Sequence, residues 1–272
     1  MYDLPSEDPE EPGLPDEFHN LQPQLLSRTL RLTGYSRENC FTASDLNLYY
    51  DVNHPLWYKR PDWFLTVDVP RLYDGQELRR SYVIWQEGKH PYVVVEFLSP
   101  GTEVEDLGRF YDEASKVPES ESVGLTQAIE RELAVREKPP GKFEVYEQYL
   151  RVPHYIVYSR YTRQLRYFKL DGGRYQEQGI AQKTPLIWLA DLELGLGIWQ
   201  GEFEDASAHW LRWCDREGNW LLSDTEQERQ AKEQAQAQLL QAARNLIATG
   251  MDLERVAEML GLSAEQVRSL LL

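Results

Sequence analysis

The amino-acid sequence predicts a mixed α/β domain followed by a helical tail. Short runs rich in β-branched and aromatic residues alternate with a stretch of helical periodicity, in the order strand, strand, helix, strand and hairpin. Hydrophobic residues make up 42% of the 272 residues, which is enough for a sizeable core. After residue 222 the composition changes to Gln, Ala and Glu, which favours an exposed helix.

The predicted strands lie in the central part of the chain. Residues 60–67 contain a proline near their start and are then rich in strand-forming side chains. Residues 91–98 are almost continuously apolar, which indicates a strand buried on both faces. Residues 155–158 predict a third strand, and residues 165–176 predict a hairpin with a glycine turn. Between the second and third strands, residues 143–150 carry apolar side chains at helical spacing.

Other segments frame this core. Residues 1–24 are acidic and rich in proline, so we expect a disordered lead before a domain that spans residues 25–222. Within the domain, residues 101–141 predict a long hydrophilic insertion, and loops of this length are usually functional or disordered. Residues 194–201 contain glycines beside a tryptophan, which predicts a turn between strands.

The tail, residues 223–272, begins with a capping box made by Ser223 and Glu226, which marks the start of a helix that continues to about residue 248. Residues 251–260 and 263–271 then predict two short helices joined by a glycine turn. This pair carries few basic residues, which favours packing or self-association over DNA binding. We therefore expect a second copy of the chain as a partner of the C-terminal helices.

Charge and composition exclude several classes of protein. The chain has 29 Lys and Arg against 45 Asp and Glu, a net charge of −16, which excludes a basic protein that coats nucleic acid but not an enzyme with a local groove. The two cysteines, Cys40 and Cys214, are far apart, which indicates a reducing compartment and no disulfide framework. No apolar run approaches the roughly 20 residues of a membrane span, and the acidic N-terminus is unlike a signal peptide. We expect a cytoplasmic protein with no membrane partner.

Two carboxylates stand out in the predicted core. Glu96 lies within the apolar run of the second strand, where a buried charge is costly unless a cation compensates it. Asp62 lies at the head of the first strand, 34 positions earlier, so adjacent strands would bring the two together. Such oxygen ligands suit Mg²⁺, and Lys142, at the start of the next helix, is the candidate to orient an attacking water. Asp62 and Lys142 also have purely structural interpretations: Asp62 could be a turn residue, and Lys142 could be a lysine exposed to solvent.

Several motifs together resemble a known family. The segment Arg-Pro-Asp-Trp at residues 60–63, the segment Val-Glu-Phe-Leu-Ser-Pro-Gly-Thr at residues 95–102, the lysine-bearing helix at residues 142–147 and the strand start at residues 151–155 are similar to the Uma2 family. That family belongs to the restriction-endonuclease-like superfamily with the PD-(D/E)xK motif. The resemblance covers about residues 40–222 and implies a restriction-endonuclease-like mixed sheet core flanked by helices.

The resemblance implies a role for each candidate residue. Asp62 and Glu96 would bind Mg²⁺, or Mn²⁺ in its place, and the carbonyl of Phe97 would be a third oxygen ligand. The superfamily motif places a lysine two residues after the glutamate. Leu98 stands there, so the resemblance implies that the lysine role has moved to Lys142. The implied activity is Mg²⁺-dependent hydrolysis of DNA phosphodiester bonds, with DNA as the partner.

The sequence also departs from the family pattern. Lys142 follows Glu96 by 46 positions, which is a longer interval, and His154 stands where the family carries an acid. The family's additional acid on its first helix has no obvious match. Asp106 resembles an acid that follows the Ser-Pro segment, and its role is open. Tyr146, one helical turn after Lys142, could share its face, although a core role is favoured. These departures keep a second interpretation open, a non-catalytic binding or assembly module that retains the nuclease fold.

Overall fold

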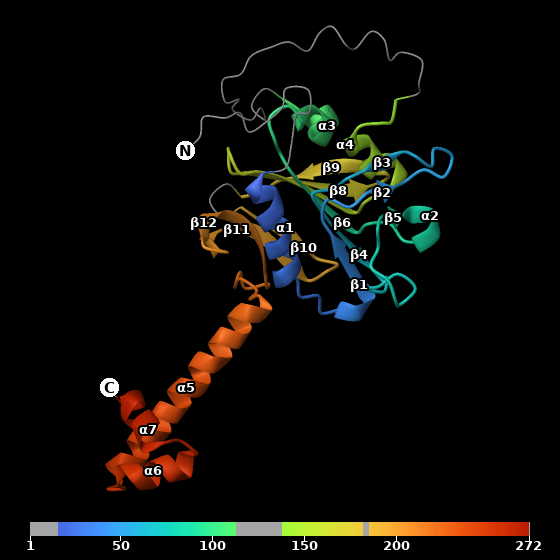
Figure 1. Cartoon of the computed structure of the whole chain (residues 1–272). Coiled ribbons are helices and arrows are strands. Elements are labelled where there is room, and N and C mark those ends of the chain that lie inside the picture. The colour runs from blue at the N-terminus through green and yellow to red at the C-terminus, as the bar shows by residue number, and fades with distance from the viewer. Residues whose placement is uncertain (1–15, 113–137, 182–184, 272) are drawn as a thin grey trace, which may run out of the picture. The chain divides into compact units, whose positions relative to one another are not determined.

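A six-stranded mixed sheet forms the centre of the main domain (Figure 1). The computed structural model describes residues 16–112, 138–181 and 185–271. The strand order is β1-β4-β6-β7-β8-β9, and β6 and β7 are parallel whereas the other neighbours are antiparallel. The strands are β1 (Cys40–Ala43), β4 (Trp63–Val67), β6 (Val93–Phe97), β7 (His154–Ser159), β8 (Gln164–Asp171) and β9 (Arg174–Gln178). The mixed α/β class predicted from the sequence is confirmed.

The middle strands of this sheet are buried on both faces. Every residue of β4, β6 and β7 is buried, which explains why the sequence of β6 is a continuous apolar run interrupted by Glu96. Side chains alternate along β6, so Val93, Val95 and Phe97 join one hydrophobic cluster while Val94 joins the other. Glu96 shares the parity of Val94 and therefore points to the second face of the sheet.

One face of the sheet is covered by helix α1 (Glu17–Thr29) and a second, three-stranded sheet. That sheet contains β10 (Leu186–Leu189), β11 (Leu194–Phe203) and β12 (Ala206–Cys214) in sequential antiparallel order. Buried hydrogen bonds attach α1 to it, because the Gln22 side chain donates to the Leu211 carbonyl at 2.8 Å and accepts from the Leu211 amide at 2.7 Å. The Trp213 indole also donates to the Leu26 carbonyl at 2.9 Å.

The other face carries short elements. They are α4 (Lys142–Glu144) with the π-helical turn η4 (Val145–Tyr149), a small sheet of β2 (Leu48–Tyr49), β3 (Tyr58–Lys59) and β5 (Tyr82–Val83), and helix α2 (Ile84–Glu87). The expected helix over residues 143–150 is therefore present, with its second half in π geometry. Phe143, Tyr146 and Leu150 are buried there, as their helical spacing predicted.

Two expectations from the sequence are wrong. Residues 16–24 of the expected disordered lead include the N-terminal part of α1, and residues 1–15 lie outside the described residues. Phe18 is buried because its ring stacks on Trp210 at a centroid distance of 5.4 Å, a tertiary contact that composition does not reveal. Residues 194–201 lie within strand β11 and are not a turn. Their glycines are needed for close packing, since a Cβ on Gly195 would lie 2.5 Å from the Cys214 sulfur.

The acidic insertion, residues 101–141, is partly helical. It contains α3 (Glu103–Leu107) and the 3₁₀ turn η2 (Gly108–Phe110), whereas residues 113–137 lie outside the described residues. Gly108 has a φ of 51° and lies directly on the Phe143 ring, which a Cβ would approach at 2.8 Å. The start of the insertion is thereby packed against α4.

The tail forms a separate compact unit, and the chain divides between Leu221 and Leu222. Its helices are α5 (Asp224–Ala248), α6 (Leu253–Leu260) and α7 (Ala264–Leu271). The capping box is confirmed, because Ser223 accepts from the Glu226 amide at 3.3 Å and Glu226 accepts from the Ser223 amide at 2.7 Å. The three helices share a small apolar core, and no helix in the described ranges is long and apolar enough to span a membrane.

Candidate active site

Asp62 and Glu96 lie together where β4 begins and β6 ends. Trp63 pairs with Val95 in the antiparallel ladder, so the residues just outside this pair face each other across the two strands. The Asp62 amide donates to Glu96 Oε2 at 3.3 Å, and Asp62 Oδ2 accepts from the Phe97 amide at 2.6 Å. Glu96 is fully buried. Two carboxylates separated by 34 positions thus share one corner of the sheet.

Lys142 reaches the same corner from the start of α4. Its ammonium lies 3.0 Å from Glu96 Oε2, and its side chain is 20% exposed. Burial of the neighbouring Phe143 holds the helix start against the sheet, which fixes the direction of the lysine. The structure therefore brings Asp62, Glu96 and Lys142 together, although Lys142 follows Glu96 by 46 positions.

Two further side chains complete the environment of Glu96. Asp106, on α3, is buried, and its Oδ1 lies 3.3 Å from the Lys142 ammonium. Tyr146 donates its hydroxyl proton to Glu96 Oε1 at 2.6 Å and is also a fully buried core residue. The position of Asp106 after the Ser-Pro segment was the one sequence signal for it. For Tyr146 the signal was its spacing one turn after Lys142.

Helix α1 contributes a histidine that the sequence reasoning missed. His19 Nδ1 lies 2.8 Å from Asp16 Oδ1, and Asp16 is the N-cap of α1. His19 Nε2 lies 3.2 Å from Ser99 Oγ and 3.4 Å from the carbonyl oxygen of Phe97. The first helix therefore presents an imidazole to the end of β6.

His154, the other departure from the family pattern, lies away from this corner at the start of β7. Its Nε2 is 2.9 Å from Asp191 Oδ2, and its Nδ1 is 2.7 Å from the Tyr167 hydroxyl. Tyr92 also donates to the same Asp191 oxygen. The buried imidazole joins the main sheet to the loop before β11 and has a structural role.

The site holds more carboxylates than cations, and their pKa values reflect this. Burial and the nearby carboxylate of Asp62 together raise the pKa of Glu96 to about 8, against the opposing effect of Lys142. Burial likewise raises the pKa of Asp106 to about 6 and raises the pKa of Asp62. Although burial lowers the pKa of Lys142, the surrounding carboxylates hold it well above its usual range. With all four groups charged, the site lacks positive charge in a medium of low dielectric constant.

The oxygen atoms at this corner fit a hard divalent cation. Asp62 and Glu96 supply carboxylates and Phe97 supplies a carbonyl, the ligand types that Mg²⁺ and Mn²⁺ prefer. Asp106 Oδ1 is buried and accepts no hydrogen bond from the described residues. Within the described ranges, no three His, Cys, Asp or Glu side chains form a metal-binding group by themselves. A metal here therefore needs the backbone carbonyl, together with water, beside the carboxylates.

These pKa shifts predict that the metal-free protein loses stability between about pH 6.5 and pH 8. The folded chain binds more protons than the unfolded chain in this range, because the pKa values of Glu96 and His19 are raised on folding. Unfolding free energy therefore falls as pH rises. The pKa of His154 is lowered, so its opposite contribution ends near pH 6.5.

Chemical denaturation in EDTA at pH 6.5 and at pH 8 measures this fall in the free energy of unfolding. Glu96→Gln removes the titrating carboxyl and should reduce the pH dependence, and Mg²⁺ added at pH 8 should restore stability to the unmodified protein. A pH dependence that is identical in the Glu96→Gln variant would contradict the electrostatic description of the site.

Comparison with known proteins gives one match. Residues 1–200 match the model of the Uma2 family, described as a putative restriction endonuclease. No curated protein and no solved structure matches the chain. The matched segment contains Asp62, Glu96, Phe97, Asp106 and Lys142.

Proposed function

The chain belongs to the Uma2 family of restriction-endonuclease-like proteins, and from this membership and the geometry of the site we propose that it is a Mg²⁺-dependent DNA endonuclease. The family indicates nuclease activity and the restriction-endonuclease-like fold. The assignment of DNA as substrate, of the metal and of each residue is our proposal. Asp62, Glu96 and the Phe97 carbonyl would hold Mg²⁺ or Mn²⁺, and Lys142 would act beside them.

The observation that carries the proposal is the convergence of three separate segments on one corner of the sheet. Lys142 lies 3.0 Å from Glu96, and Glu96 lies 3.3 Å from the amide of Asp62. Burying these charges is costly, and local folding does not require it. A catalytic site made of two acids and a lysine explains why this cost of burial is retained, since the same groups serve phosphodiester hydrolysis.

Each residue has a distinct part in this mechanism. The bound cation would polarise the phosphate and acidify a water molecule. The ammonium of Lys142 orients the attacking water and offsets negative charge that develops on the phosphate. The Tyr146 hydroxyl fixes Oε1 of Glu96, and Asp106 keeps a carboxylate beside Lys142, so the ammonium stays at the site while Glu96 serves as ligand.

One observation favours the alternative, a binding or assembly module without catalysis. The ammonium of Lys142 already compensates Glu96 through an ion pair, so the corner has one structural cation of its own. In that case the ion pairs of Lys142 with Glu96 and Asp106 would hold α3, α4 and β6 together, and these residues would bind no metal.

Plasmid nicking separates the two functions. The full-length chain should convert supercoiled DNA to the nicked form with Mg²⁺ or Mn²⁺ and should not do so in EDTA. Calorimetry should show binding of the divalent ion to the wild-type protein. Absence of both nicking and ion binding would replace the nuclease proposal by the binding module. Self-association through the C-terminal helices and a cytoplasmic location stay predictions.

A further inference from the structure

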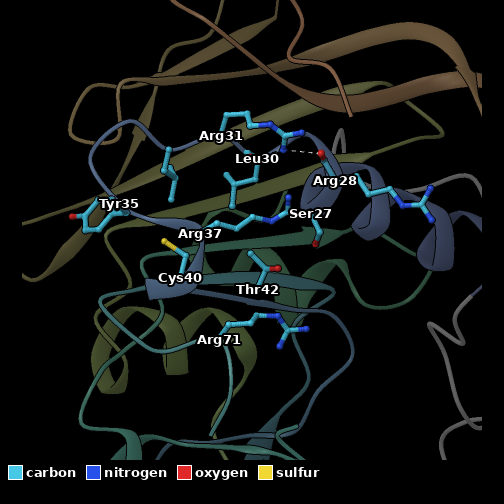
Figure 2. Close-up of a pocket in the computed structure, with 10 residues that line it drawn as sticks. Ser27, Arg28, Leu30, Arg31, Tyr35, Arg37, Cys40, Thr42 and Arg71 are labelled. Atoms are coloured by element: carbon cyan, nitrogen blue, oxygen red, sulfur yellow. Dashed lines mark hydrogen bonds between the residues drawn. The ribbon is translucent and has the colours of Figure 1, made fainter. Parts of the chain in front are cut away.

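A second candidate site lies at the opposite end of α1 from His19. A cavity of about 350 Å³ opens between the C-terminal end of α1, the following loop and strand β1 (Figure 2). Its lining contains neither Asp62, Glu96 nor Lys142. The Trp63 indole donates to the hydroxyl of Ser27, which lines the cavity, at 2.9 Å. A hydrogen bond thus joins one wall of the cavity to strand β4, but the cavity is distinct from the corner that holds Asp62, Glu96 and Lys142.

Arginines are concentrated around the cavity in a chain with a net charge of −16. Four arginines line it, namely Arg28, Arg31, Arg37 and Arg71, and none of the ten described residues that line it is an Asp or a Glu. Arg28 is paired at 2.6 Å with Glu204, and both side chains are about half exposed. Arg71 forms no ion pair with any part of the chain that the structure describes, and its side chain is exposed. This concentration of guanidinium groups favours an anion.

Hydroxyl groups add further donors. Ser27, Tyr35 and Thr42 line the cavity, and none of their hydroxyls donates a hydrogen bond to a described residue. The Ser27 oxygen accepts from the Trp63 indole, so its own proton is directed elsewhere. Guanidinium groups have donors and no acceptors. A cavity with this lining complements a ligand that offers several acceptor oxygens close together.

We propose that this cavity binds a phosphate ester, with its phosphate among the arginines and hydroxyls. The planar guanidinium matches phosphate geometry and binds it through paired hydrogen bonds. Leu30, Leu32 and Cys40 supply an apolar wall, and the volume is in the range of cavities that hold small organic ligands. The phosphate belongs either to a free mononucleotide or to a nucleic-acid strand. The inference does not depend on the nuclease proposal, since it requires neither metal nor cleavage.

Calorimetry on the full-length chain in EDTA tests the inference with three probes. They are thymidine monophosphate, a short oligothymidylate without terminal phosphates, and inorganic phosphate. We expect one of the two esters to bind more tightly than inorganic phosphate. Preference for the mononucleotide assigns the site to a free ligand, and preference for the oligothymidylate assigns it to a strand.

Arg71→Gln is the test variant, because Arg71 is exposed and its loss should leave the fold intact. It should weaken binding of the ester by about tenfold or more, as expected for a lost charge-assisted hydrogen bond. Arg229→Gln removes the same charge from an exposed position of α5 and should leave the affinity unchanged. The inference is wrong if neither ester binds, if inorganic phosphate binds as tightly as both esters, or if the two variants behave alike.

Discussion

Glu96→Gln should abolish metal-dependent DNA cleavage while the protein remains folded. The amide keeps the shape of the carboxylate, and its one oxygen can still accept from the Tyr146 hydroxyl, which lies 2.6 Å from Oε1 of Glu96. The amide nitrogen takes the place of Oε2, which lies 3.0 Å from the Lys142 ammonium, and accepts no hydrogen bond. The substitution removes the negative charge that a divalent cation requires. Loss of such an electrostatic or metal-binding group lowers rates by about 100-fold or more. Nicking rates with Mg²⁺ measure the loss of cleavage, and thermal unfolding of the same preparations shows whether the fold is retained.

Glu233→Gln is the matched control for this variant. Glu233 lies on α5 in the tail, its side chain is 68% exposed, and it pairs with Arg229 at 3.7 Å. Its removal should leave nicking within about twofold, since exposed ion pairs contribute little. Asp62→Asn should behave like Glu96→Gln. If Glu96→Gln cleaves DNA as fast as the wild type, Glu96 is not a metal ligand.

Lys142→Met should cause the largest loss of stability of any single change at the site. It removes the ammonium that lies near both Glu96 and Asp106 and leaves the two carboxyls buried together. Removing one partner of a buried ion pair costs on the order of 3 kcal/mol. The loss should be greater at pH 8 than at pH 6, because the two carboxyls avoid the cost at lower pH by binding protons. Chemical denaturation at both pH values checks this.

Lys89→Met provides the comparison for Lys142→Met. Lys89 lies 3.7 Å from Asp68, and both side chains are half exposed, so its removal should cost well under about 1 kcal/mol at either pH. Equal losses in the two lysine variants would show that the Lys142 ammonium is not needed to compensate Glu96. Nicking by Lys142→Met at the wild-type rate would remove its proposed part in catalysis.

The sequence was sufficient where a local pattern has a single physical meaning. The apolar run of β6 predicted a strand buried on both faces, and Glu96 within it predicted a charge that needs compensation. The sequence pattern of Ser223 and Glu226 predicted a helix start, because capping depends on residues that are three positions apart. Such features depend on neighbours in the chain.

The parts that sequence reasoning missed depend on contacts between distant segments. Phe18 is one apolar residue in an acidic, proline-rich segment and shows no periodicity, so its burial against Trp210 became visible only in the packed structure. Gly195 suggested a turn, whereas the approach of Cys214 requires glycine within a strand. In both cases the deciding partner is far away in the sequence.

The candidate site shows the same division. The sequence by itself determined the fold class and singled out Asp62, Glu96 and Lys142 as residues to be tested together. Only the tertiary structure decided that Asp106, Tyr146 and His19 lie at the same corner. Only the tertiary structure also showed that Arg71 lines one cavity together with arginines from α1 and from the segment between α1 and β1. The physical reason is that side-chain proximity across a sheet is set by how helices pack on its faces, and that packing combines residues whose separation in the chain carries no signal of contact.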